Sequence, residues 1–184
     1  MIKRKKKASS SIGYTFLFFI VMLMFVVSMY MTQVAKLMTH QHHITDALTD
    51  SVLASLVADD VYYFETFEET GTPVVRLRDV SESYSIYKDC MTDAISGTEG
   101  FYYNFKFDTF ICYEVEGSSI KITTYNENGN KTVVSGSIGS VRAPTGELIT
   151  KTSAYGKVRF DIQSILDGSL VTKTKDIYCA LEIN

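Results

Sequence analysis

The first strong pattern in the chain is a long apolar run near its start. Residues 12–31 contain no charged side chain, and only Gly13, Thr15 and Ser28 interrupt the apolar series. A bilayer core of about 30 Å needs about 20 helical residues, so the run is long enough to cross it. It is also longer than the apolar core of a secretory signal, and no small-x-small cleavage site follows it. The pattern therefore predicts a retained transmembrane helix over residues 12–33.

Helical periodicity continues after the predicted span. Residues 32–64 contain neither Pro nor Gly, and apolar side chains recur there at spacings of three and four. We expect one helix of some fifty residues from Ile12 to about Phe64, on the order of 75 to 80 Å long. An acidic stretch with Gly71 then ends the helical pattern, which makes residues 34–70 an amphipathic helix with its linker.

The pattern changes twice in residues 71–184. A short helix is expected over 81–96, where one face would carry apolar and aromatic side chains, namely Tyr84, Tyr87, Cys90, Met91, Ala94 and Ile95. From Phe101 onward the period falls to two and β-branched and aromatic residues dominate. Strands are expected within 101–117, 118–125, 131–138, 155–166 and 170–183.

The loop between two of these strands indicates how they pair. Residues 125–131 are polar and contain Gly129, which is typical of a hairpin loop. An antiparallel meander is the simplest arrangement of the strands. The expected fold is α+β: a long N-terminal helix whose outer part packs on a C-terminal antiparallel β-sheet domain.

Charge gives the expected orientation in the membrane. Basic residues fill positions 3–7, directly before the span, and such an excess marks the cytoplasmic side. Residues 1–11 are then a cytoplasmic leader, and the sheet domain lies outside. Without the five basic residues of the leader, 13 of the 18 Lys and Arg remain against 21 Asp and Glu, a net charge of −8. An acidic exterior makes nucleic acid an unsuitable partner, whereas the span requires membrane lipid.

The three cysteines allow two interpretations. Cys90, Cys112 and Cys179 are an odd number, so they cannot all pair within one chain, and none has the close spacing of a metal site. One disulfide with one remaining thiol is the first possibility, with Cys112 and Cys179 as the candidate pair. Three free cysteines, buried for structural reasons, are the second.

The sequence offers little for catalysis. All three histidines lie at 40, 42 and 43, and solvated helix surface explains them better than a metal pair at His40 and His43. The nucleophile elbow, the phosphate-binding loop, the zinc-protease motif and the C-x-x-C pair are all missing from the sequence. We therefore expect no catalytic, cofactor-binding or metal-binding residues, and a protein that is not an enzyme.

Two stretches resemble a known family. KASSSIGYTFLFFIVMLMFVVSMYMTQVAKLMTHQHHITDALTDSVLASLVADD and YGKVRFDIQSILDGSLVTKTKDIYCALEI, near the two ends of the chain, resemble type IV pilin-like proteins. The nearest likeness is to the minor pseudopilins of the tight-adherence (Tad or Flp) pilus, the TadE/TadF-like proteins. The resemblance implies a structural or assembly subunit in a bacterial cell membrane. Its partners would be other pilin subunits and the pilus assembly platform.

The resemblance also implies processing by a prepilin peptidase. By analogy the cut would fall after Ala8, before Ser9, or after Gly13, before Tyr14. In this family a Glu five residues into the mature helix assists assembly, but no acidic residue precedes Asp46 here. A minor or membrane-retained subunit is therefore expected rather than a major pilin.

Close helix packing would then supply the contact with partner subunits. A patch of small residues at Ser9, Ser10, Ser11 and Gly13 would allow neighbouring helices to approach. The alternative function is a single-pass anchored extracellular domain that binds or senses a ligand without catalysis.

Overall fold

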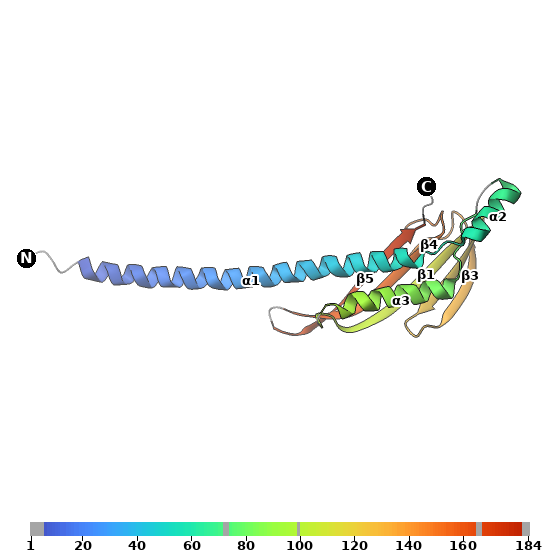
Figure 1. Ribbon diagram of the computed structural model, residues 1–184. Helices are drawn as coiled ribbons and strands as arrows, with labels where there is room; N and C mark the ends of the chain where they lie inside the picture. Colours follow the sequence, from blue (N-terminus) through green and yellow to red (C-terminus); the bar gives the residue numbers. More distant parts are fainter. Residues whose placement is uncertain (1–5, 72–73, 99, 165–166, 182–184) are drawn as a thin grey trace, which may run out of the picture. The chain divides into compact units, whose positions relative to one another are not determined.

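The fold consists of three helices and one five-stranded sheet in the part of the chain that the structure describes (Figure 1). The computed structural model describes residues 6–71, 74–98, 100–164 and 167–181, with side chains from residue 12 onward. The elements in chain order are α1 (Lys6–Ser55), α2 (Asp60–Thr70), α3 (Val80–Ser96), β1 (Tyr103–Glu116), β2 (Ser119–Asn126), β3 (Lys131–Ser137), β4 (Ser153–Gln163) and β5 (Leu170–Ala180). All strand pairs are antiparallel, in the order β3-β2-β1-β4-β5. The predicted α+β class is confirmed.

The chain divides into two compact units at residue 43. In the first unit, the apolar side chains of α1 from Ile12 to Met31 are exposed, and α1 is the one described helix long and apolar enough to cross a membrane. The second unit, 43–184, contains the end of α1 together with the sheet. The predicted boundary near residue 70 follows the change in sequence pattern, whereas the compact unit begins earlier because the end of α1 belongs to the core.

The main core lies between the sheet and two helices on the same face. From α1 come Ile44, Leu48 and Val52, spaced four residues apart and at most 1% exposed. From α3 come Tyr87 and Met91, both fully buried. Side chains at this spacing form one stripe along a helix, and the stripe is covered by the sheet. The prediction that the outer part of the long helix packs on the sheet is therefore confirmed.

Gly156 is the point where both helices meet the sheet most closely. A Cβ atom on this β4 residue would lie 2.7 Å from Cγ2 of Val52 and 3.0 Å from Cε2 of Tyr87. Both neighbours are completely buried, so neither has free space into which to move. Tyr87 in turn stacks on Phe110 of β1, with ring centroids 4.6 Å apart. Glycine is therefore required at this position for α1 and α3 to pack on the strands together.

The prediction of one unbroken helix to about Phe64 is wrong. Helix α1 ends at Ser55, and α2 begins at Asp60. Between them the chain is extended and pairs with a distant segment: Asp59 N–H donates to the Arg76 carbonyl and Arg78 N–H to the Val57 carbonyl, both at 3.0 Å. These bonds satisfy backbone groups that would otherwise continue the helix. Asp59 then caps α2 by accepting a hydrogen bond from Tyr62 N–H.

The sheet is not a simple meander, which corrects the predicted connectivity. Strands β1, β2 and β3 follow one another, but the chain then crosses to the other side of β1 before it forms β4. The connection packs on the face away from the helices, where a second buried cluster consists of Ile111, Tyr113, Ile120, Ala143, Ile149 and Tyr155. The sheet is therefore covered on both faces. Helix α3 lies where predicted, except that Cys90 is exposed rather than on its buried face.

We predict that Gly156→Ala destabilises the sheet domain by about 1–3 kcal/mol, because the added methyl group overlaps two buried side chains. Urea unfolding of the detergent-solubilised chain, followed by the near-ultraviolet circular dichroism of its tyrosines, measures the change. Gly97→Ala is the matched control. Its backbone φ is −73° and its nearest neighbour would be a carbonyl oxygen at 3.7 Å. Equal stability of the two variants would contradict the proposed role of Gly156.

Candidate functional site

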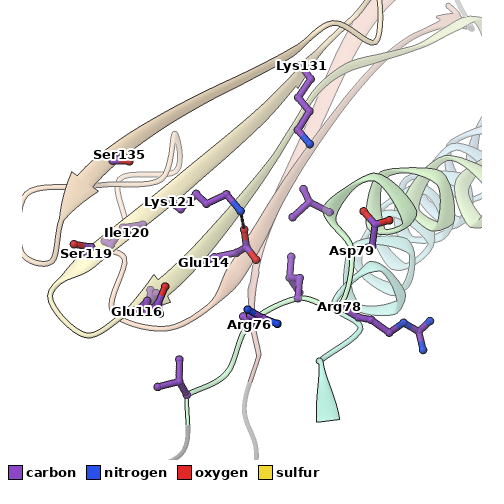
Figure 2. A pocket seen from close by; sticks show the side chains of 14 residues that line it. Arg76, Arg78, Asp79, Glu114, Glu116, Ser119, Ile120, Lys121, Lys131 and Ser135 are labelled. Carbon is purple, nitrogen blue, oxygen red and sulfur yellow. Dashed lines mark hydrogen bonds and ion pairs between the residues drawn. The ribbon is translucent and has the colours of Figure 1, made fainter. Parts of the chain in front are cut away.

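A cavity in the sheet domain opens beside the start of α3 (Figure 2). It has a volume of about 590 Å³, within the range of sites that take a small ligand or a few side chains. The segment before α3 forms one wall, and β1, β2 and β3 form the other. Its lining includes Arg76, Arg78 and Asp79 on the first wall and Glu114, Glu116, Lys121, Lys131 and Ser135 on the second.

Local structure places these charges on the two walls. Strands β1 and β2 are joined by a tight turn in which Gly117 adopts a φ of 59°, a conformation that glycine takes without strain. The resulting register puts Glu114 directly opposite Lys121. On the other wall, Asp79 caps α3 by accepting a hydrogen bond of 2.7 Å from Ser81 N–H, which fixes the preceding segment.

Most charges in the cavity already have a partner. Lys121 Nζ lies 2.7 Å from Oε2 of the largely buried Glu114, and Figure 2 shows this pair across the sheet wall. Arg78 pairs with Glu82 at 2.9 Å on the first turn of α3. Within the described residues Lys131 has no carboxylate partner at ion-pair distance, and its Nζ lies 6.0 Å from the centre of the Tyr125 ring. The Lys131 side chain reaches toward the cavity in Figure 2.

Arg76 links the cavity wall to α2. Its guanidinium pairs with Asp59 at 3.0 Å and covers the Tyr62 ring at 3.5 Å from the centroid. The Tyr62 N–H, followed by the Arg76 guanidinium, lowers the pKa of Asp59 because both favour the charged carboxylate. The Tyr62 hydroxyl donates to Glu116 at 3.1 Å, and this bond raises the pKa of Tyr62. The network holds α2 against the end of β1.

The cavity is suited to binding charged groups, because charged side chains line it. The arrangement presents both signs of charge on an open surface, with one ammonium that lacks an ionic partner among the described residues. No histidine lies in the cavity, because all three are on α1 at positions 40, 42 and 43. Among the described residues, no group of three or more His, Cys, Asp and Glu side chains could hold a metal ion.

The residues predicted for processing and helix packing lie elsewhere, at the start of α1. Gly13 and Tyr14 are exposed on the helix, and apart from the adjacent residues and the helix's own backbone no atom lies within 4 Å of a Cβ built on Gly13. The side chains of Ala8, Ser9, Ser10 and Ser11 lie outside the described residues. The structure therefore places the two described residues on an exposed part of α1.

The candidate disulfide between Cys112 and Cys179 is not formed, which corrects the predicted pairing. Both cysteines lie opposite Ala154, Cys112 on β1 and Cys179 on β5, so strand β4 separates them. Two strand spacings amount to about 10 Å, beyond the roughly 7 Å limit between the Cα atoms of a disulfide. Burial raises the pKa of both thiols. Cys90 is also free, and it is exposed on α3.

The sequence interpretation missed the cavity. Its one local signal is the pair of opposite charges at Glu114 and Lys121, which flank the turn at Gly117 at cross-strand spacing. Arg76 and Arg78 carry no such signal, because their position depends on backbone pairing with residues 57–59. No family model, curated protein or solved structure matches this chain.

We predict that iodoacetamide modifies Cys90 alone in the folded protein and all three cysteines after denaturation without reductant. Selective modification is expected because Cys90 is exposed, whereas the other two thiols are buried and have a raised pKa. Intact-mass measurement counts the adducts. A denatured, unreduced chain that takes up a single adduct would indicate a disulfide and contradict this arrangement. Cys90→Ser is the control that should leave the folded protein unmodified.

Proposed function

We propose that this chain is a membrane-anchored minor pseudopilin, a structural or assembly subunit of a Tad-type, type IV-like pilus. The observation that carries the proposal is that one continuous helix contains both the candidate membrane span and part of the sheet-domain core. The buried end of α1 therefore fixes the sheet domain to the same helix that contains the candidate span. Such a connection suits a subunit that holds its place in an assembly.

The two segments of α1 differ in the way this role requires. From Ile12 to Met31 the helix presents apolar side chains on all sides, and the exposed fractions of the large ones lie between 42% and 73%. Ile44, Leu48 and Val52 instead form a single stripe buried beneath the sheet. A helix that is apolar all round is suited to lipid or to contact with other apolar helices, whereas a single stripe is suited to a globular core.

The proposed family rests on the sequence resemblance. The sequence lacks the acidic residue that this family has near the start of the helix, and this absence bears on whether the subunit is a major or a minor one. A charge in hydrocarbon is costly unless it is paired, and the span contains none. The helix is therefore stable in lipid without a partner that neutralises an acidic side chain. This favours a minor or membrane-retained subunit over a major pilin.

The proposal includes no catalytic activity, cofactor or nucleic-acid partner. The partners would be membrane lipid, other pilin or pseudopilin subunits and the assembly platform, with a prepilin peptidase if the leader is removed. The charged cavity supports this in a limited way, since its residues suit ionic contacts rather than bond making or breaking.

We expect Gly13→Leu to reduce association with neighbouring pilin subunits, because the larger side chain keeps adjacent helices apart. Crosslinking in intact membranes followed by co-purification measures the effect. Ser28→Leu is the matched control, since it adds the same side chain to the span outside the small-residue patch. Unchanged recovery of partner subunits with Gly13→Leu would contradict this packing role, and recovery of no pilin subunit with the unaltered chain would contradict the function.

The proposed topology places the N-terminus in the cytoplasm and the sheet domain outside the membrane. We expect a membrane-impermeant maleimide to label Cys90 in intact cells, because this thiol is exposed on α3. The Cys90→Ser variant should remain unlabelled, since Cys112 and Cys179 are buried. If Cys90 is labelled only after the cells are disrupted, the sheet domain lies in the cytoplasm and the proposed topology is wrong.

The alternative function is a single-pass anchored domain that binds or senses a ligand. The open cavity of about 590 Å³ and the unpaired ammonium of Lys131 among the described residues favour it. The crosslinking experiment separates the two functions, because an anchored sensor would be recovered without pilin subunits.

A further inference from the structure

Helix α2 is oriented opposite to an ordinary surface helix. A surface helix normally turns its apolar side toward the protein and its polar side toward water. In α2 none of the eleven residues is buried. The side that contacts the protein is fixed largely by polar bonds, and the other side exposes large apolar side chains.

The inner side of α2 is held by specific contacts at both ends. Tyr62 lies under the Arg76 guanidinium and donates to Glu116, and the hydroxyl of Thr66 accepts a 3.0 Å hydrogen bond from Val74 N–H. Asp59 caps the start of the helix, while Gly71, with a φ of 70°, ends it and donates to the Phe67 carbonyl. These contacts fix which side of the helix faces outward.

The outer side consists of Val61, Phe64 and Phe67, which we call the aromatic face of α2. Their exposed fractions are 63%, 63% and 53%. At 100° per residue these positions lie on the side of the helix opposite Tyr62 and Thr66. They belong to the sheet-domain unit rather than to the membrane span, so the lipid that would cover the span does not explain their exposure. Clustered apolar exposure of this kind marks an interaction surface.

Charge identifies the kind of partner. Helix α2 carries Asp60, Glu65, Glu68 and Glu69 and no Lys or Arg. Helices that lie on membrane surfaces are instead rich in basic residues, which bind anionic lipid headgroups. Three of these residues, Asp60, Glu65 and Glu68, lie beside the aromatic face, which disfavours a lipid surface and complements a protein surface with basic residues.

We propose that the aromatic face of α2 docks into an apolar groove of a partner protein, and that Lys and Arg side chains line the rim of that groove. Phe64 and Phe67 fill the groove, as the anchors of a helix-in-groove complex do. Asp60, Glu65 and Glu68, which lie beside the aromatic face at 100° per residue, face the basic rim. The inference goes beyond the proposed pilus role, because it names the surface that α2 recognises and does not depend on the partner being a pilus protein.

The test places the photo-crosslinker p-benzoylphenylalanine at position 64 of the full chain, in the cells that naturally produce it. The expected result is a crosslink to a protein segment whose apolar residues are flanked by Lys or Arg, located by mass spectrometry of the crosslinked peptides. The double variant Glu65→Lys/Glu68→Lys should abolish the crosslink through charge repulsion. Both carboxylates are exposed, so near-ultraviolet circular dichroism should show an unchanged fold.

Two controls make the result specific. The same crosslinker at Val133, which is 52% exposed on β3, should not give this product. The double variant Asp89→Lys/Asp93→Lys makes the same charge change at exposed positions of α3 and should retain the crosslink at position 64. Adducts with lipid, with a second copy of this chain or with a segment lacking basic residues would overturn the proposal. A crosslink that survives Glu65→Lys/Glu68→Lys, or no crosslink at all, would do the same.

Discussion

The close approach of two helices to the sheet at Gly156 is the contact on which the rest of the domain depends. Val52 from α1 and Tyr87 from α3 occupy the space that any side chain at this position would need. Because α1 also contains the candidate membrane span, this packing makes the end of that helix part of the sheet-domain core. The second buried cluster lies on the opposite face of the sheet and includes no residue from the helices. Within the sheet domain, β3, most of β5 and α2 remain largely exposed.

The spacing of apolar residues predicted the helices correctly where the local sequence alone determines the structure. The stripe of Ile44, Leu48 and Val52 was visible as a spacing of four residues, and the sheet covers it as expected. The break after Ser55 could not be read in this way, since residues 56–59 contain no Pro or Gly. Their extended conformation depends on hydrogen bonds to Arg76 and Arg78, which are about twenty residues away. Non-local pairing therefore overrides a helical pattern at this position.

The strands were predicted from their period of two, but their order was not. Alternation fixes which residues share a face and contains no information about which side of β1 receives β4. The pairing of Cys112 with Cys179 failed for the same reason, since both lie on one face but β4 separates them. The cavity combines a predictable cross-strand pair, Glu114 with Lys121, with a wall formed by the segment around Arg76 that only the tertiary structure positions.

The distance in sequence between the two sides of the main core affects how the protein is made. Gly156 follows Val52 by 104 positions. At roughly 5–20 residues per second, a ribosome needs on the order of 5–20 s to reach it. During this interval the stripe on α1 has been synthesised and its covering strand has not. Ile44, Leu48 and Val52 therefore lack their β4 partners until that strand emerges, and a chain that ends before β4 cannot complete the core around them.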